Sequence, residues 1–266
     1  MWKLDWITED NFRKHVIETI KQYGETLRSY DLKYYNRNII DPIKMIFDKS
    51  VYLSSWSEIV KNEIFRQRDK SNNNSIGYFH QKIFRYVEDC EVPEEGWDVI
   101  FTPPGGIELP NGDKVKTIYV EMKNKHNTMN DASAGKTYIK MQDQLLQDDD
   151  CCCFLVEAIA KQSQNINWST TVDKRKVSHK RIRRVSIDQF YYLVTGEETA
   201  FYDMCMILPN VIDEVVSNRE TPIPNDTVYS ELEKNSEKYG SMAMAFYMLG
   251  FDSYSGFKDK DQSRLL

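Results

Sequence analysis

Residues 151–160 constrain the fold more than any other stretch of the sequence. They read Cys-Cys-Cys-Phe-Leu-Val-Glu-Ala-Ile-Ala, a continuous apolar run that only Glu157 interrupts. A run of this length suits a strand that is buried on both faces, and such strands lie in the middle of sheets that are covered by helices. The sequence therefore predicts a sheet with a helix on either side, and the segments before residue 151 should supply its other strands.

Those earlier segments show the two-residue period of strands from residue 97 onward. Residues 98–102 form a short apolar segment that ends at a Pro-Pro-Gly-Gly sequence. Residues 107–109 and 114–123 then flank Asn111 and Gly112, which are a strong hairpin signal. We therefore expect a three-strand meander, followed by a helix and the buried strand.

Apolar residues recur at helical spacing elsewhere, which predicts helices over 8–29, 57–68, 76–87, 132–147 and 225–249. The polar residues 71–75 predict a loop. The order helix, three-strand meander, helix, strand indicates a mixed sheet of the α/β class with α+β character. We expect an N-terminal helical region over 1–70 that packs on the core, a core with a basic segment over 71–185, and a C-terminal helical region over 186–266 that supports recognition or dimerisation.

The composition argues against several functional classes. No apolar run approaches the ~20 residues of a membrane-spanning helix and no apolar signal segment opens the chain, so we expect a cytoplasmic protein that does not bind membranes. The five cysteines form no Cys-x-x-Cys pair, which favours buried, reduced thiols over zinc or disulfides. No glycine-rich phosphate loop is present, so we expect no nucleotide cofactor.

The formal net charge is −6, but one basic segment stands apart. Residues 174–184 contain seven lysines and arginines and no acid. An acidic chain with one concentrated basic segment suits a nuclease better than a protein that coats nucleic acid, because a metal site needs carboxylates. The other interpretation is a solvated face, which most charge runs are.

Asp98, Glu121 and Lys123 are the candidate catalytic residues. Asp98 begins one predicted strand, and Glu121 and Lys123 lie two residues apart on another, so these two share a face while Met122 points the other way. Two acids and an amine that meet at one point can hold a divalent metal ion and activate water against a phosphodiester. The alternative is that these are ordinary exposed side chains. Burial of ionisable groups near a sheet interior, however, costs free energy unless the groups are paired or bind a metal.

These residues resemble the Pro-Asp…(Asp/Glu)-x-Lys nuclease superfamily. The segments 96–99, 119–130, 136–138 and 156–161 are similar to one group of type II restriction endonucleases, which cleaves short palindromes of the GGNCC kind. The likeness spans residues 70–200, and Trp97 replaces the usual proline. Relatives often place an acid that points at the metal in the preceding helix; His80 and Gln81 stand there, and we expect them to act only behind the metal ligands.

The resemblance implies roles for the candidate residues. Asp98 and Glu121 would bind Mg²⁺ through carboxylate oxygens, and the backbone carbonyl of Met122 would be a further ligand. Lys123 would position or help to deprotonate the attacking water. The substrate would be double-stranded DNA, and a cognate DNA methyltransferase would belong to the same system.

A second set of polar residues is predicted to contact DNA. Its members are Lys125, Asn127, Asn130, Lys136, Gln164, Asn165, Arg175, Lys180, Arg181, Arg183 and Arg184. Amide side chains after the buried strand could read base edges, and the cations could bind phosphate or guanine. For the residues around the start of the helix at 132–147, a solvated surface is the alternative.

Three hypotheses follow from the sequence. The first is a Mg²⁺-dependent type II restriction endonuclease that cuts a palindrome containing GG and CC as a homodimer, since two-fold protein symmetry matches two-fold DNA symmetry. The second is a DNA repair or recombination nuclease with little sequence specificity. The third is a catalytically inert DNA-binding protein. The intact candidate site counts against the third, and the additional surface after residue 160 favours the first over the second.

Overall fold

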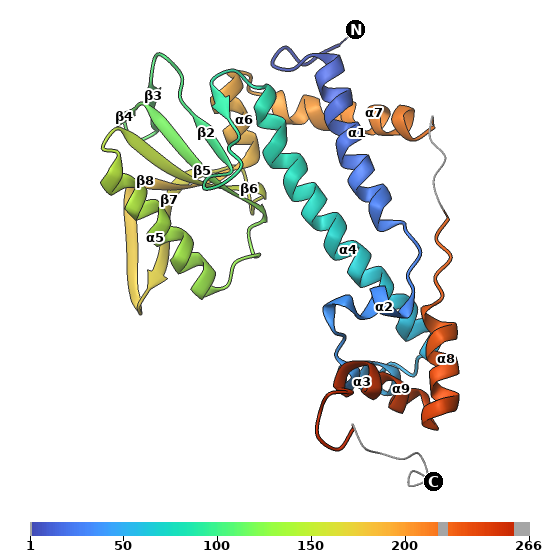
Figure 1. The fold of residues 1–266 in the computed structure, drawn as a ribbon. Coiled ribbons are helices and arrows are strands. Elements are labelled where there is room, and N and C mark those ends of the chain that lie inside the picture. Colours follow the sequence, from blue (N-terminus) through green and yellow to red (C-terminus); the bar gives the residue numbers. More distant parts are fainter. Residues whose placement is uncertain (1, 218–222, 258–266) are drawn as a thin grey trace. The chain divides into compact units, whose positions relative to one another are not determined.

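The computed structural model of the protein describes residues 2–217 and 223–257 (Figure 1). Contacts divide the chain into two units: Met1–Ile20 with Asn74–Arg219, which we call the sheet unit, and Lys21–Asn73 with Glu220–Leu266, which we call the helical unit. This division differs from the three consecutive regions expected from the sequence, because each unit combines two segments that are distant along the chain. None of the helices in the described ranges is long and apolar enough to span a membrane.

The sheet unit contains a six-stranded mixed sheet. Its strand order is β1 (Cys90–Glu91), β2 (Val99–Phe101), β5 (Thr117–Lys125), β6 (Cys151–Ile159), β8 (Arg175–Ser186) and β7 (Asn165–Val172). β5, β6 and β8 are parallel, and the other neighbours are antiparallel. β6 lies inside the sheet and is buried from Cys151 to Glu157. The predicted mixed α/β class and its buried central strand are therefore confirmed.

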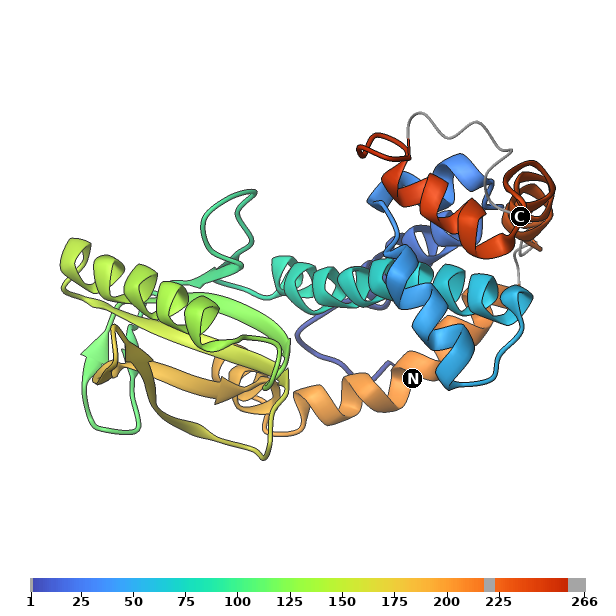
Figure 2. The ribbon, with the colours of Figure 1, turned by 90° about the horizontal axis from the view of Figure 1, so that it is seen from below.

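The helices α5 (Asp131–Gln147) and α6 (Ile187–Thr195) lie against opposite faces of this sheet (Figures 1 and 2). The sheet unit also contains η2 (Ile83–Tyr86) and α7 (Ala200–Ser217), while α1 (Glu9–Thr26) and α4 (Trp56–Lys82) contribute residues to both units. On one face, Met141 of α5 and Leu155 of β6 belong to one apolar cluster. On the other face, Phe190 of α6 and Phe154 of β6 belong to another. Consecutive residues of β6 thus face different helices, which is why the strand carries no polar alternation.

A two-stranded hairpin, β3 (Ile107–Glu108) and β4 (Lys114–Val115), stands outside the six-stranded sheet. The predicted three-strand meander is therefore wrong in one respect: β2 pairs directly with β5, and the strand expected over 114–123 is two strands. The break has a local cause, because the Lys116 N–H donates to the carbonyl of Asp150 at 2.6 Å instead of extending β4.

α4 continues through residues 71–75, where the sequence predicted a loop. The polar side chains there bond within the helix: Asn73 Nδ2 donates to Asp69 Oδ2 at 2.9 Å, and Ser71 Oγ donates to the Gln67 carbonyl at 3.3 Å. Ser75 is only 7% exposed, so packing also supports this turn. Local propensity misled the prediction because such contacts make serine and asparagine compatible with a helix interior.

The helical unit has its own apolar core. It contains α2 (Leu32–Tyr35), η1 (Asn36–Asn38), α3 (Pro42–Val51), α8 (Val228–Tyr239) and α9 (Met242–Phe251). Tyr35, Ile64, Leu232 and Phe246 lie in one buried cluster of this unit. The single helix predicted over 225–249 is two helices, because Gly240 takes a left-handed conformation with φ 83° at the end of α8.

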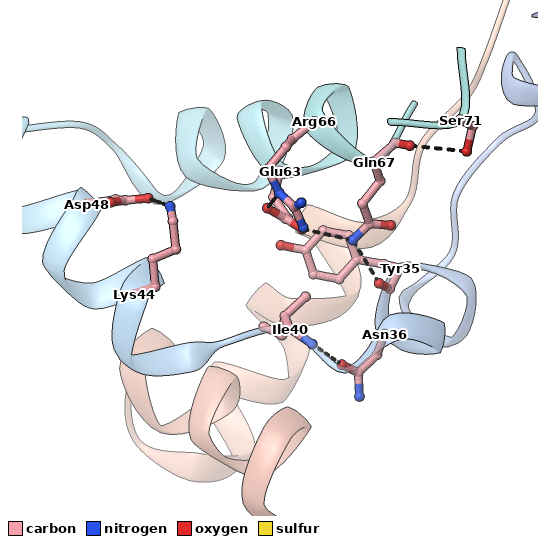
Figure 3. A network of polar contacts seen from close by, with 9 residues as sticks. All are labelled: Tyr35, Asn36, Ile40, Lys44, Asp48, Glu63, Arg66, Gln67 and Ser71. Atoms are coloured by element: carbon pink, nitrogen blue, oxygen red, sulfur yellow. Dashed lines mark hydrogen bonds and ion pairs between the residues drawn. The ribbon is translucent and has the colours of Figure 1, made fainter. Parts of the chain in front are cut away.

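A polar network borders that core (Figure 3). Gln67 Nε2 of α4 donates to the Tyr35 carbonyl at 3.1 Å and to Glu63 Oε1 at 3.0 Å. Glu63 is buried, and Arg66 Nε donates to its Oε2 at 2.6 Å. The network therefore joins α4 to α2 and supplies the partners that a buried carboxylate needs.

Candidate active site

β2 and β5 bring Asp98 and Glu121 together. The antiparallel register pairs Val99 with Val120, and one further step along it places Asp98 opposite Glu121. The Asp98 N–H donates to the Val120 carbonyl at 3.0 Å, and Asp98 Oδ2 accepts the Met122 N–H at 2.6 Å. Asp98 is therefore bonded on either side of Glu121, to Val120 through its backbone N–H and to Met122 through its carboxylate.

Two lysines bind the Glu121 carboxylate. Lys123 Nζ lies 2.7 Å from Oε1, and Lys140 Nζ lies 2.7 Å from Oε2. Lys123 and Glu121 share a face of β5, as strand alternation requires, so the structure brings the three proposed catalytic residues together. Lys140 comes from α5 and was missed by the sequence analysis. It stands beside Met141, which packs inward, and helical periodicity carries no signal that the neighbouring lysine reaches β5.

Lys140 also contacts the segment that leads into β2. Its Nζ donates to the Gly96 carbonyl at 2.5 Å and lies 4.1 Å from the centroid of the Trp97 ring. Trp97 Nε1 in turn donates to Gln144 Oε1, 3.2 Å away and one turn further along α5. Trp97 therefore packs the start of β2 against α5.

The two carboxyl groups have opposite electrostatic environments. Burial raises the pKa of Asp98, and the Glu121 charge adds to this shift, while the Met122 N–H and the two lysines oppose it. Burial acts on Glu121 as well, but the hydrogen bonds from Lys123 and Lys140 outweigh it and lower the pKa of Glu121. A cation placed between these carboxylates would favour the ionised form of Asp98.

The donor set of the site fits a small, hard cation. Asp98 and Glu121 offer carboxylate oxygens, and Mg²⁺ takes few protein ligands because it keeps several of its waters. The Met122 side chain is buried on the other face of β5, so this residue could contribute only its backbone carbonyl to an ion, and that role stays a prediction. Among residues 2–217 and 223–257, no group of three or more His, Cys, Asp and Glu side chains is placed to hold a metal ion.

A buried ion pair lies next to Lys123. The parallel register pairs Lys123 with Glu157 of β6, which is 1% exposed. Arg184 of β8 donates from Nη2 to Glu157 Oε1 at 2.5 Å and to the His126 carbonyl at 2.9 Å. Arg184, proposed as a DNA contact, therefore neutralises Glu157 and secures the end of β5.

Other residues proposed to contact DNA also have partners within the protein. Arg183 is 3% exposed and donates to Asn165 Oδ1 at 2.5 Å and to Asn167 Oδ1 at 2.8 Å, so it and Asn165 support the pairing of β7 with β8. Gln164 bonds Ser186 through its backbone.

Three further members of this set bond an acid or cap a helix. Lys180 Nζ lies 2.8 Å from Asp113 Oδ2, and Arg181 Nε lies 3.6 Å from the same oxygen. Asn130 is the N-cap of α5, since its Oδ1 accepts the Ser133 N–H at 2.9 Å.

The remaining members of the set face solvent. Lys125 ends β5 and Asn127 follows it, Lys136 lies on α5, and Arg175 begins β8; all four are exposed. These positions suit contacts with a large ligand such as DNA, whereas the internally bonded residues would have to break contacts first.

α4 approaches β5 at a glycine near the end of the helix. A Cβ at Gly77 would stand 3.4 Å from Asn124 Oδ1 of β5. His80 lies near His15 of α1, and burial lowers the pKa of His80 to about 4. Gln81 is half-buried. A role for His80 or Gln81 behind the metal ligands stays a prediction.

Comparison with known proteins gives the family of this chain. Residues 4–217, which include Asp98, Glu121 and Lys123, match the family model described as Eco47II restriction endonuclease. The chain is 28% identical over 224 residues to the type II restriction enzyme Sau96I of Staphylococcus aureus, covering 81% of this chain and 82% of that protein. It is 29% identical over 227 residues to the type II restriction enzyme Eco47II of Escherichia coli, covering 81% and 89%. The chain therefore belongs to the Eco47II restriction endonuclease family and is a type II site-specific deoxyribonuclease.

Proposed function

We propose that this enzyme uses Mg²⁺ to hydrolyse both strands of double-stranded DNA at a short palindrome that contains GG and CC. The observation that carries the proposal is the meeting of Asp98 and Glu121, with Lys123 bonded to Glu121 at 2.7 Å. The GG and CC content rests on the resemblance to the group that cleaves GGNCC-like sites.

The chain would hold the ion with a few oxygen ligands. Asp98 and Glu121 would bind it, and the Met122 carbonyl would complete the set. When bound, Mg²⁺ would supply positive charge to the phosphate and lower the pKa of a bound water. Lys123 would orient the attacking water and offset the charge that develops on the phosphate oxygens. Asp98 is positioned for its role in advance by the Met122 N–H.

The proposed active form of the enzyme is a homodimer. A palindrome is two-fold symmetric, so a homodimer would place one such site on each strand. The exposed residues Lys125, Asn127, Lys136 and Arg175 are the proposed first contacts with the DNA backbone. A methyltransferase of the same system would protect the host DNA.

Digestion of plasmid DNA with Mg²⁺, followed by sequencing of the ends, tests the function. Discrete fragments that share one palindromic end sequence are the expected result. A smear would support a nuclease with little sequence specificity. Retained binding without cutting would support the inert DNA-binding protein, and either result would contradict the proposal.

Substitution of the candidate residues tests the site. We expect Glu121→Ala and Lys123→Ala to fold normally and to lose more than about 100-fold of the cleavage rate, since even the outer partners of metal ligands are worth about 10–100-fold. The exposed Glu88 offers a matched control, and Glu88→Ala should cleave at the wild-type rate. Full activity of either candidate variant would refute the catalytic assignment.

A further inference from the structure

Lys140 has no role in the nuclease motif, yet it makes three contacts at the site. It bonds Glu121 Oε2 at 2.7 Å and the Gly96 carbonyl at 2.5 Å, and it lies 4.1 Å from the Trp97 ring centroid. One ammonium group therefore bridges the strand that carries Glu121 and the segment that leads to Asp98. The Trp97 ring, which makes the third contact, is itself held by a hydrogen bond to Gln144 of α5.

The charge of Lys140 matters as much as its position. Asp98 and Glu121 are two half-buried carboxyl groups on neighbouring strands, and two negative charges placed there would repel each other. Lys123 occupies one oxygen of Glu121, and Lys140 occupies the other. The four side chains together are close to neutral, so the site is electrostatically satisfied without a bound cation.

The same oxygen cannot serve the ammonium and a divalent ion equally well. An ion held by Asp98 and Glu121 would repel the Lys140 ammonium, because both are positive and compete for one carboxylate. The Trp97 ring offers the displaced ammonium a face that remains within reach.

We propose that Lys140 is the placeholder cation of the metal-free site, a positioning residue that holds Glu121 Oε2 and yields it when the divalent ion binds. The proposal rests on the proposed function, because it requires Asp98 and Glu121 to be the metal ligands. It makes Lys140 a competitor of the ion, which distinguishes it from a residue that merely orients the carboxylate.

Calorimetric titration with Mg²⁺ and with Ca²⁺, in the absence of DNA, tests this competition. Lys140→Gln keeps a hydrogen-bond donor for the Gly96 carbonyl but removes the charge. Because the competing charge is gone, we expect Lys140→Gln to bind both ions about fivefold more tightly than the wild type. This factor corresponds to the largest usual contribution of an ion pair that is partly open to solvent. Lys140→Arg should return the affinity toward the wild-type value. Lys136→Gln, one turn earlier on α5 and exposed, controls for the loss of a nearby positive charge.

Thermal unfolding in a chelator gives a second measurement that does not depend on cleavage. Lys140→Gln should melt at a lower temperature than Lys136→Gln without metal, and Mg²⁺ should narrow this difference. Equal or weaker metal binding by Lys140→Gln, relative to Lys136→Gln, would overturn the placeholder role alone. A wild-type enzyme that binds neither ion would overturn the metal site and the placeholder together.

Discussion

Among single residues, the cations of segment 174–184 differ most in their surroundings. Lys174, Arg175 and Lys176 at the β7–β8 turn are exposed. Arg183, by contrast, is buried and bonds Asn165 and Asn167 across the strand pair. A guanidinium with fixed partners cannot meet DNA without leaving asparagine oxygens unpaired, so the exposed turn suits phosphate contact better.

This difference predicts that two arginines of β8 contribute unequally to stability. Arg183→Ala should lower the free energy of unfolding by about 2 kcal/mol, because hydrogen bonds to charged groups contribute about 1.5–3 kcal/mol and two asparagines lose their partner. Arg175→Ala, its exposed control, should stay within about 0.5 kcal/mol of wild type. Urea unfolding measures both, and equal stabilities would show that Arg183 has no structural role.

At the scale of elements, the sequence pattern predicts correctly the features that one segment determines by itself. The apolar run at 151–160 is β6, and alternation alone places Glu121 and Lys123 on one face. Features that depend on a partner distant in sequence were not predicted. The pairing of Arg183 with Asn165 and the reach of Lys140 to Glu121 depend on how strands and helices pack, which periodicity within one segment does not contain.

The packing of α1 against α4 makes stability depend on pH. His15 of α1 faces Phe79 of α4, whose carbonyl accepts its Nε2–H at 2.9 Å. Burial lowers the pKa of His15 and of His80 to about 4; the charges of Arg85 and Lys82 lower that of His15 further, and the Phe79 hydrogen bond and Glu18 oppose this. The unfolded chain takes up these protons near the ordinary value of 6.5, so stability is complete above that pH and is lost as pH falls toward 4.

We therefore expect the urea midpoint of the wild type to decrease as the pH is lowered from 7 to 5. Each histidine should lower the free energy of unfolding by on the order of 1.4 kcal/mol per pH unit below 6.5. His15→Gln keeps an N–H for the Phe79 carbonyl but does not titrate, so it should flatten this dependence by about half. If the urea midpoints of the variant and the wild type decreased equally with falling pH, groups other than His15 would control the loss of stability in acid.

At the scale of the whole molecule, the two units have separate apolar cores. Phe190 is buried in the core of the sheet unit, 4.8 Å from Phe84 between ring centroids. Phe246 is buried in the helical unit, 5.3 Å from Trp56. The helical unit combines residues 21–73 with the segment after 219, so its core needs both of these segments.

Because the two apolar cores are separate, we expect the two units to unfold locally in separate events. Phe246→Ala should destabilise the helical unit by about 3–5 kcal/mol, the usual cost of removing a buried phenylalanine. Hydrogen exchange should then accelerate in α3, α8 and α9 but not in β5 and β6. Phe190→Ala is the matched variant and should give the opposite pattern. If Phe246→Ala accelerated exchange in β5 and β6 to the same extent, the two units would open as one, and the integrity of the active site would depend on helices that contribute no catalytic residue.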